Sequence, residues 1–73
     1  MEFLLVRFDQ DRRVIVNGAP GEWRTNQLLQ LQAGNYIITL APPNDFAPPE
    51  RWCVLKHTTV LDPKVLSFTS SIV

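Results

Sequence analysis

The stretch Leu31-Gln32-Ala33-Gly34-Asn35-Tyr36-Ile37-Ile38-Thr39-Leu40 decides the fold class of this chain. A polar turn that contains Gly34 leads directly into a run of aromatic and aliphatic residues. Because successive side chains of a β-strand point to opposite faces, Tyr36, Ile38 and Leu40 share one face. The stretch therefore predicts a strand that begins just after a tight corner, with Gly34 and Tyr36 as structural residues.

Alternating apolar residues predict strands along most of the chain. They occur at residues 1–8, 13–17, 27–32, 35–40, 51–61 and 65–73, and the residues expected to face inward include Leu4, Val6, Phe8, Val14, Val16, Leu29, Leu31, Ile38, Leu40, Leu66, Phe68 and Ile72. Residues 27–32 are also compatible with one helical turn, because Gln and Leu are good helix formers. We favour a strand there, since so short a segment between two turns rarely forms a helix. The pattern predicts an all-β fold, a small antiparallel β-sandwich of about six or seven strands with an immunoglobulin-like topology.

Polar and proline-rich segments separate these strands. Residues 9–12 and 62–64 are predicted turns, and residues 17–21 are dense in turn formers, because Asn17 and Gly18 tolerate a positive φ angle. Residues 41–50 contain four of the six prolines of the chain. Proline cannot donate a hydrogen bond to a sheet, so this segment is expected to form a long loop outside any central strand.

The size and charge of the chain limit the classes of function. Its 73 residues make a single domain over residues 1–73, with 45% hydrophobic residues to supply a core. Seven basic and seven acidic residues give a net charge of zero. Because binding to phosphate backbones depends on positive charge, no nucleic acid is expected as a partner. Zero net charge also does not oppose association, which favours a protein partner or a second copy.

The cysteine count and the apolar segments bear on the compartment. Cys53 is the only cysteine, so no disulfide can form within the chain and a reducing compartment is mildly favoured. Residues 1–8 lack the basic start and the cleavage site of a signal peptide, so a cytoplasmic location is the default expectation. Nowhere do about 18 apolar residues follow one another, and no membrane-spanning helix is predicted.

The order of glycines and strands resembles the PEGA domain. The resemblance covers roughly residues 9–69 and depends on Val14-Ile15-Val16-Asn17-Gly18, Gly21, Thr25 and Leu29, the stretch 31–40, and the closing Asp62-Pro63-Lys64-Val65-Leu66-Ser67-Phe68. The chain departs from the family pattern at Asn17, where Asp is usual, and at Asn26, where Pro is usual; the four-residue motif that names the family is not present as such. The resemblance implies a sandwich similar to carboxypeptidase-regulatory and transthyretin-like domains. It also implies a non-catalytic and often extracytoplasmic module that binds surface polymers or neighbouring proteins.

Tyr36 is expected to form a tyrosine corner, in which the hydroxyl group bonds back to the main chain and fixes the crossing between sheets. The alternative is that its ring stacks on a ligand. We favour the structural role, because the spacing after Gly34 suits a corner and no polar cluster surrounds the residue in the sequence.

No constellation of residues predicts catalysis or metal binding. Cys53 and His57 are the only possible nucleophile and base, and on one strand they lie roughly 13 Å apart at about 3.3 Å per residue, whereas the two groups need a separation of about 3 Å. One cysteine and one histidine do not complete a zinc site, and Asp9 and Asp11 are expected in a solvated turn. The glycines at 18 and 21 lack the residues of a phosphate loop. The chain is predicted not to be an enzyme, with no cofactor and no metal.

Aromatic residues beside turns are the candidates for binding. Trp23 and Arg24 follow the turn at 17–21, Trp52 follows Arg51, and prolines on both sides present Asn44, Asp45 and Phe46 at low entropic cost. A purely structural role is the alternative for each aromatic residue. In that case Trp52 fills the core, and Phe46 folds back to cap the sandwich.

Two hypotheses of function follow. The first is a non-catalytic binding or scaffolding module that recognises a protein or a cell-surface polysaccharide through its loops. The second is a structural module that forms homo-oligomers through an apolar sheet face or an edge strand. It depends on the outward residues Phe3, Leu5, Ile15 and Ile37 and on a strand-forming N-terminus that is free to pair with another copy.

Overall fold

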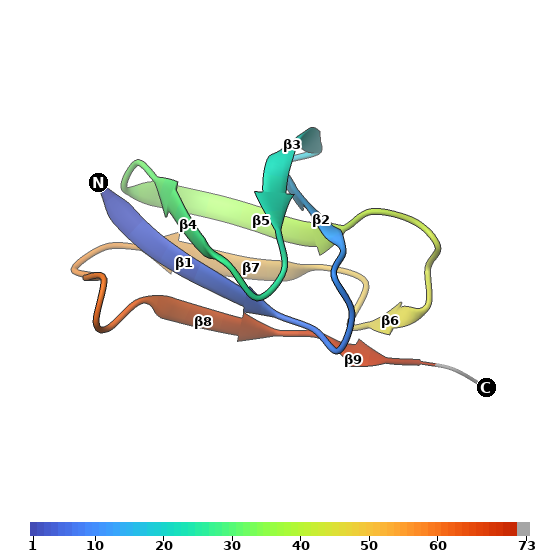
Figure 1. Cartoon of the computed structure of the whole chain (residues 1–73). Helices are drawn as coiled ribbons and strands as arrows, with labels where there is room; N and C mark the ends of the chain where they lie inside the picture. Colours follow the sequence, from blue (N-terminus) through green and yellow to red (C-terminus); the bar gives the residue numbers. More distant parts are fainter. Residues whose placement is uncertain (72–73) are drawn as a thin grey trace.

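A computed structural model describes residues 1–71 as an all-β fold of nine strands (Figure 1). The strands are β1 (Glu2–Arg7), β2 (Arg13–Val16), β3 (Ala19–Arg24), β4 (Leu28–Leu31), β5 (Gly34–Leu40), β6 (Phe46–Ala47), β7 (Arg51–Leu55), β8 (Lys64–Ser67) and β9 (Thr69–Ser70). Within these residues, no helix is long and apolar enough to cross a membrane.

The strands form two main sheets that pack face to face. One sheet has the order β4-β1-β8, and the other has the order β3-β2-β5-β7. A two-stranded ribbon of β6 and β9 closes one end (Figure 1). The predicted all-β sandwich is confirmed, with two refinements: nine strands are present in place of about six or seven, and β1 pairs with β8 in parallel, while the other pairs are antiparallel.

The core lies between the two sheets and follows the alternation of the sequence. Its buried apolar residues are Leu4, Val6, Phe8, Val14, Val16, Leu29, Ile38, Leu40, Phe46, Cys53, Leu55, Leu66 and Phe68, with Trp23, Leu31 and Tyr36 packed against them. Every inward residue predicted from the period of two is among these, except Ile72, which lies outside the described residues. Burial of one apolar face of each sheet is therefore the interaction that holds the sandwich together.

The predicted turn at 17–21 is wrong in its length. Only Asn17 and Gly18 form the turn, with φ angles of 51° and 77°, and Val16 already pairs with Ala19. Two residues with positive φ suit the right-handed twist of a hairpin, and an Asn-Gly pair is its strongest sequence signal. The strand that follows, β3, contains Pro20, which is tolerated because β3 is an edge strand and needs hydrogen bonds on one side only.

Other predicted boundaries also need correction. Residues 27–32 contain β4, which confirms the strand and excludes the helical turn. The strand predicted at 51–61 ends at Leu55, and β8 and β9 replace the single strand predicted at 65–73. The loop at 41–50 contains the short β6. The N-terminal strand β1 is not available for a second copy, because β4 and β8 occupy both of its edges.

Candidate functional site

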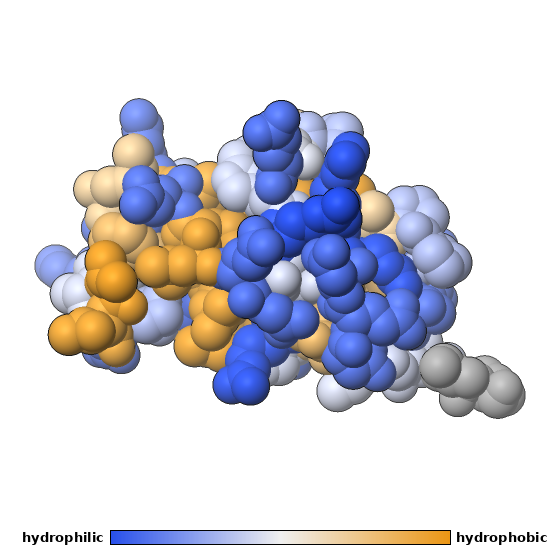
Figure 2. All heavy atoms as spheres, in the orientation of Figure 1, coloured by the Kyte–Doolittle hydropathy of each residue, from blue (hydrophilic) through white to orange (hydrophobic). Residues whose placement is uncertain are grey.

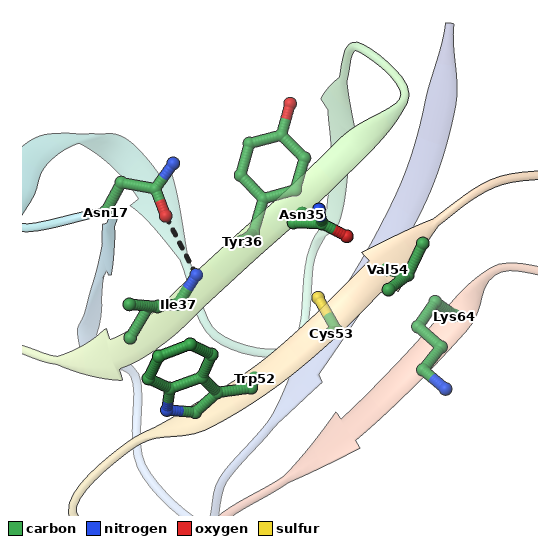
Figure 3. Close-up of a pocket in the computed structure, with 8 residues that line it drawn as sticks. All are labelled: Asn17, Asn35, Tyr36, Ile37, Trp52, Cys53, Val54 and Lys64. Atoms are coloured by element: carbon green, nitrogen blue, oxygen red, sulfur yellow. Dashed lines mark hydrogen bonds between the residues drawn. The ribbon is translucent and has the colours of Figure 1, made fainter.

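A shallow concavity of about 610 Å³ lies over β5 and β7 and extends to β8. It is lined by Asn17, Asn35, Tyr36, Ile37, Trp52, Cys53, Val54 and Lys64 (Figure 3). Because Cys53 and Ile38 point into the core, the alternate residues Ile37, Trp52 and Val54 point outward from the same sheet. This concavity therefore lies on the outer face of a sheet and contains Trp52, one of the binding candidates from the sequence, while the other candidates lie elsewhere.

Trp52 is the most prominent side chain of this concavity. It is 73% exposed and lies directly across from Ile37 in the β5–β7 ladder. Figure 3 shows the Trp52 ring beside the Ile37 side chain. The indole Nε1 donates a hydrogen bond of 2.6 Å to a carboxylate oxygen of Glu50. This bond holds the polar edge of the ring and leaves its apolar faces as the contact surface. The alternative that Trp52 fills the core is excluded by its exposure.

Asn17 forms the rim of the concavity and also shapes it. Its carboxamide Oδ1 accepts a hydrogen bond of 2.8 Å from the main-chain N–H of Ile37 (Figure 3). The main-chain N–H of Asn17 donates to the Ile37 carbonyl at 2.8 Å. The side chain thereby continues the β2–β5 ladder beyond the end of β2. The carboxamide nitrogen does not take part in this pairing and remains at the rim as a hydrogen-bond donor.

Tyr36 forms the predicted tyrosine corner. Its hydroxyl group donates a hydrogen bond of 2.6 Å to the carbonyl oxygen of Gln32, four residues upstream. Gln32 lies between β4 of one sheet and β5 of the other, so this bond holds the crossing between the sheets. Gly34, with a φ angle of 155°, allows the sharp entry into β5. The structural roles predicted for Gly34, Tyr36 and the turn residue Gly18 agree with this geometry.

One ion pair, between Arg12 and Asp45, holds the proline-rich loop at residues 41–50 against the sandwich. The guanidinium of Arg12 donates two bonds to Asp45, at 2.9 Å and 3.1 Å, and Nη1 also donates to the carbonyls of Ala41 and Pro43. The hydrogen bonds from Arg12 lower the pKa of the Asp45 carboxyl group below its ordinary value. Both carboxylate oxygens of Asp45 therefore accept hydrogen bonds from Arg12, whereas Asn44 is exposed.

Phe46, a binding candidate from the sequence, lies in the core. It is 8% exposed and makes edge-to-face contacts with Phe8 and Phe68, at centroid distances of 6.4 Å and 5.7 Å. The structure thus agrees with the alternative in which Phe46 folds back to cap the sandwich. The physical reason is that a loop with both ends on the sandwich buries its one large apolar side chain.

Trp23 and Arg24 lie on β3, at the opposite edge of the sheet from Trp52. Trp23 is half-buried against the core, and its ring covers Gly21 so closely that a Cβ atom there would overlap it. Arg24 is exposed, 3.8 Å from Asp11. The two tryptophans therefore do not belong to one site, and the packing of Trp23 supports its structural role.

The remaining chemical candidates stay apart. Cys53 is buried on β7, and burial raises the pKa of its thiol. His57 lies beyond the end of β7, with a φ angle of 59°, and not on the same strand as the sequence predicted. Among residues 1–71, no group of three or more acidic, cysteine or histidine side chains is arranged to hold a metal ion.

Comparison with protein-family models, with curated proteins and with solved structures finds no match to this chain. The likeness to the PEGA domain accordingly stays a resemblance of sequence pattern. One of its departures has a structural counterpart: Asn26 has a φ angle of 63°, which proline cannot adopt, and its N–H donates to the Val6 carbonyl at 2.6 Å.

Six residues of the concavity were not predicted from the sequence as lining residues, namely Asn17, Asn35, Ile37, Cys53, Val54 and Lys64. The available signal was the outward set of the alternation, which includes Ile37 in β5 and Trp52 and Val54 in β7. Placing these residues side by side requires the register between the two strands, and the sequence pattern does not contain it.

Proposed function

We propose that this chain is a non-catalytic binding module whose ligand is a neutral, hydroxyl-rich surface polymer, that is, a polysaccharide. The observation that carries the proposal is the exposure of Trp52, 73%, on a shallow concavity that is open to solvent. A flat aromatic face packs against the apolar C–H face of a sugar ring, and the bond to Glu50 orients the indole in advance.

The polar residues around Trp52 suit such a ligand. The amide groups of Asn17 and Asn35 both donate and accept hydrogen bonds, as sugar hydroxyls do. Lys64 is the only charged residue of the lining. A strongly anionic ligand would need more positive charge than this, so a neutral polymer fits better.

The experiment is a titration of a panel of neutral and acidic polysaccharides, followed by isothermal titration calorimetry. Trp52→Ala is expected to weaken binding about 30-fold, because loss of a central tryptophan contact costs about 2 kcal/mol. Glu22→Ala is the control, since Glu22 is exposed on β3, at the opposite edge of the sheet from Trp52, and lies outside the concavity. Equal polysaccharide binding by the Trp52→Ala variant and the parent chain overturns the proposal. If the chain binds proteins but none of the polysaccharides, the ligand is a protein and not a polymer.

A second function, self-association, is favoured by a different surface. Leu5 of β1 lies between Leu28 of β4 and Val65 of β8 on the outer face of their sheet, and Val60 and Leu61 are exposed in the loop before β8. Figure 2 shows apolar atoms gathered over one half of this face, next to a polar half. Ile15 and Ile37 lie on the outer face of the other sheet, so the outward apolar residues form two separate surfaces. Light scattering of a Val65→Glu variant tests this surface: it is expected to shift an oligomer to monomer, and an unchanged mass refutes the function.

A further inference from the structure

The hydrogen-bond pattern of β5 shows which main-chain groups of β7 face outward. Both the N–H and the C=O of Ile37 pair with Asn17, on the side of β2. Since these groups alternate in direction along a strand, Tyr36 points its N–H and C=O toward β7, where it lies opposite Cys53. The main-chain groups of Trp52 and Val54 therefore point away from β5, toward the free edge of the sheet.

This edge carries unpaired main-chain groups within the described part of the chain. Over residues 1–71, β5 is the only strand paired with β7, and no other backbone hydrogen bond involves Trp52 or Val54. The side chains of these two residues are 73% and 52% exposed. The opposite edge, β3, contains Pro20, a residue that protects an edge strand from pairing, but β7 contains no proline.

We propose that β7 pairs antiparallel with β7 of a second copy of this chain, with Cys53 on the two-fold axis. In that register Trp52 lies opposite Val54 of the second copy, and the main-chain groups that face outward on one strand meet those that face outward on the other. The two four-stranded sheets become one continuous sheet. Because the pairing uses the same edge on both copies, the assembly closes as a dimer.

Charge complementarity selects both the second copy and the register. Glu50 immediately precedes β7 and Lys56 immediately follows it, and both side chains are exposed. With Cys53 on the axis, Glu50 lies opposite Lys56 of the second copy at each end of the paired strands. A shift that puts Trp52 opposite Trp52 of the second copy would place Glu50 opposite Val54 and lose both pairs. Opposite charges across two antiparallel strands stabilise the pairing, and like charges weaken it.

The inference goes beyond the proposed polymer binding and does not rest on it. Pairing uses the main chain of β7, whereas the contact with a polymer uses the outward face of the Trp52 ring. A single paired strand makes a small interface, so a weak dimer is expected, and measurements need protein concentrations up to about 1 mM.

The test is sedimentation velocity on the parent chain and on charge variants. Lys56→Glu places Glu opposite Glu at both ends and is expected to weaken the dimer about tenfold. Adding Glu50→Lys to it re-creates opposite charges and is expected to restore the dimer. Arg13→Glu, an equal change of charge on β2, is the control and is expected to leave the dimer unchanged. A parent chain that is monomeric at about 1 mM overturns the inference. So does a dimer that Val65→Glu dissociates and Lys56→Glu does not.

Discussion

Replacement of Phe46 by Leu tests whether the aromatic residue of the proline-rich loop is part of the core. Leu keeps an apolar side chain in the site but removes two edge-to-face contacts, with Phe8 and Phe68. Each such contact contributes about 0.5–1.5 kcal/mol beyond the buried area, so the loss is about 1–3 kcal/mol. For a domain of this size, 1 kcal/mol shifts the melting temperature by about 4–8 °C, and we expect a decrease of about 5–20 °C.

The choice of Leu over Ala follows from the stability available. A chain of 73 residues is stabilised by roughly 4–11 kcal/mol in total, at about 0.05–0.15 kcal/mol per residue. Phe46→Ala costs about 3–5 kcal/mol, enough to unfold much of the protein and to make any loss of binding uninterpretable. Phe46→Leu leaves a folded protein in which stability and binding are measured separately.

Urea denaturation at 25 °C, followed by circular dichroism, gives the free energy of unfolding for the Phe46→Leu variant. Asn44→Ala is the matched control, because Asn44 lies in the same loop and is exposed; we expect a change below about 0.5 kcal/mol for it. The reasoning is refuted if Phe46→Leu unfolds at the same urea concentration as the parent chain. It is also refuted if that variant loses polymer binding without losing stability.

Three further outcomes follow from single contacts. Tyr36→Phe removes the 2.6 Å bond to the Gln32 carbonyl and is expected to cost about 1 kcal/mol in urea denaturation, and an unchanged midpoint contradicts the tyrosine corner. Because Arg12 lowers the pKa of Asp45, the pair stabilises the fold above the unfolded-state pKa of about 3.9 and loses this contribution as the pH falls through the lower folded value. Thermal melts of Asp45→Asn between pH 2 and 6 are expected to show less acid destabilisation than the parent chain, and equal profiles contradict this role. Burial and a raised pKa keep the Cys53 thiol protonated, so a thiol reagent is expected to react slowly with the native protein and fast in urea, and fast native labelling contradicts the buried placement.

The core of this protein was predictable because burial follows the period of two in each strand. Leu4 and Val6 are buried while Phe3 and Leu5 remain half-exposed, as the alternation indicates. The same rule failed at β3, because this edge strand contains Pro20 and Gly21, two residues that are typical of turns. It also placed the end of the strand predicted at 51–61 too far along the chain. The strand ends at Leu55, but apolar and β-branched residues continue past it into an exposed loop.

The candidate site was less predictable because it depends on which residues meet across strands. Sequence identified Trp52 as a large aromatic residue but did not show that it lies opposite Ile37 and projects outward. It likewise identified Asp45 and Phe46 as presented by prolines. Arg12, far away in the sequence, binds Asp45 and holds the loop against the sandwich, and Phe46 of the same loop is buried in the core. Strand register and contacts between distant segments, and not residue type, distinguish outward-facing residues from core residues here.

Glu50 connects the two surfaces proposed for this protein, and its replacement separates them. Its carboxylate accepts the hydrogen bond from the Trp52 indole, and the same side chain lies opposite Lys56 of a second copy in the proposed dimer. Glu50→Gln keeps an oxygen acceptor for the indole but removes the charge. Polymer binding therefore depends on a feature that the glutamine retains, and dimer formation depends on one that it loses. If the variant binds polymer normally but dimerises weakly, the concavity and the free edge of β7 act independently. If both properties fall together, the orientation of Trp52 requires the dimer.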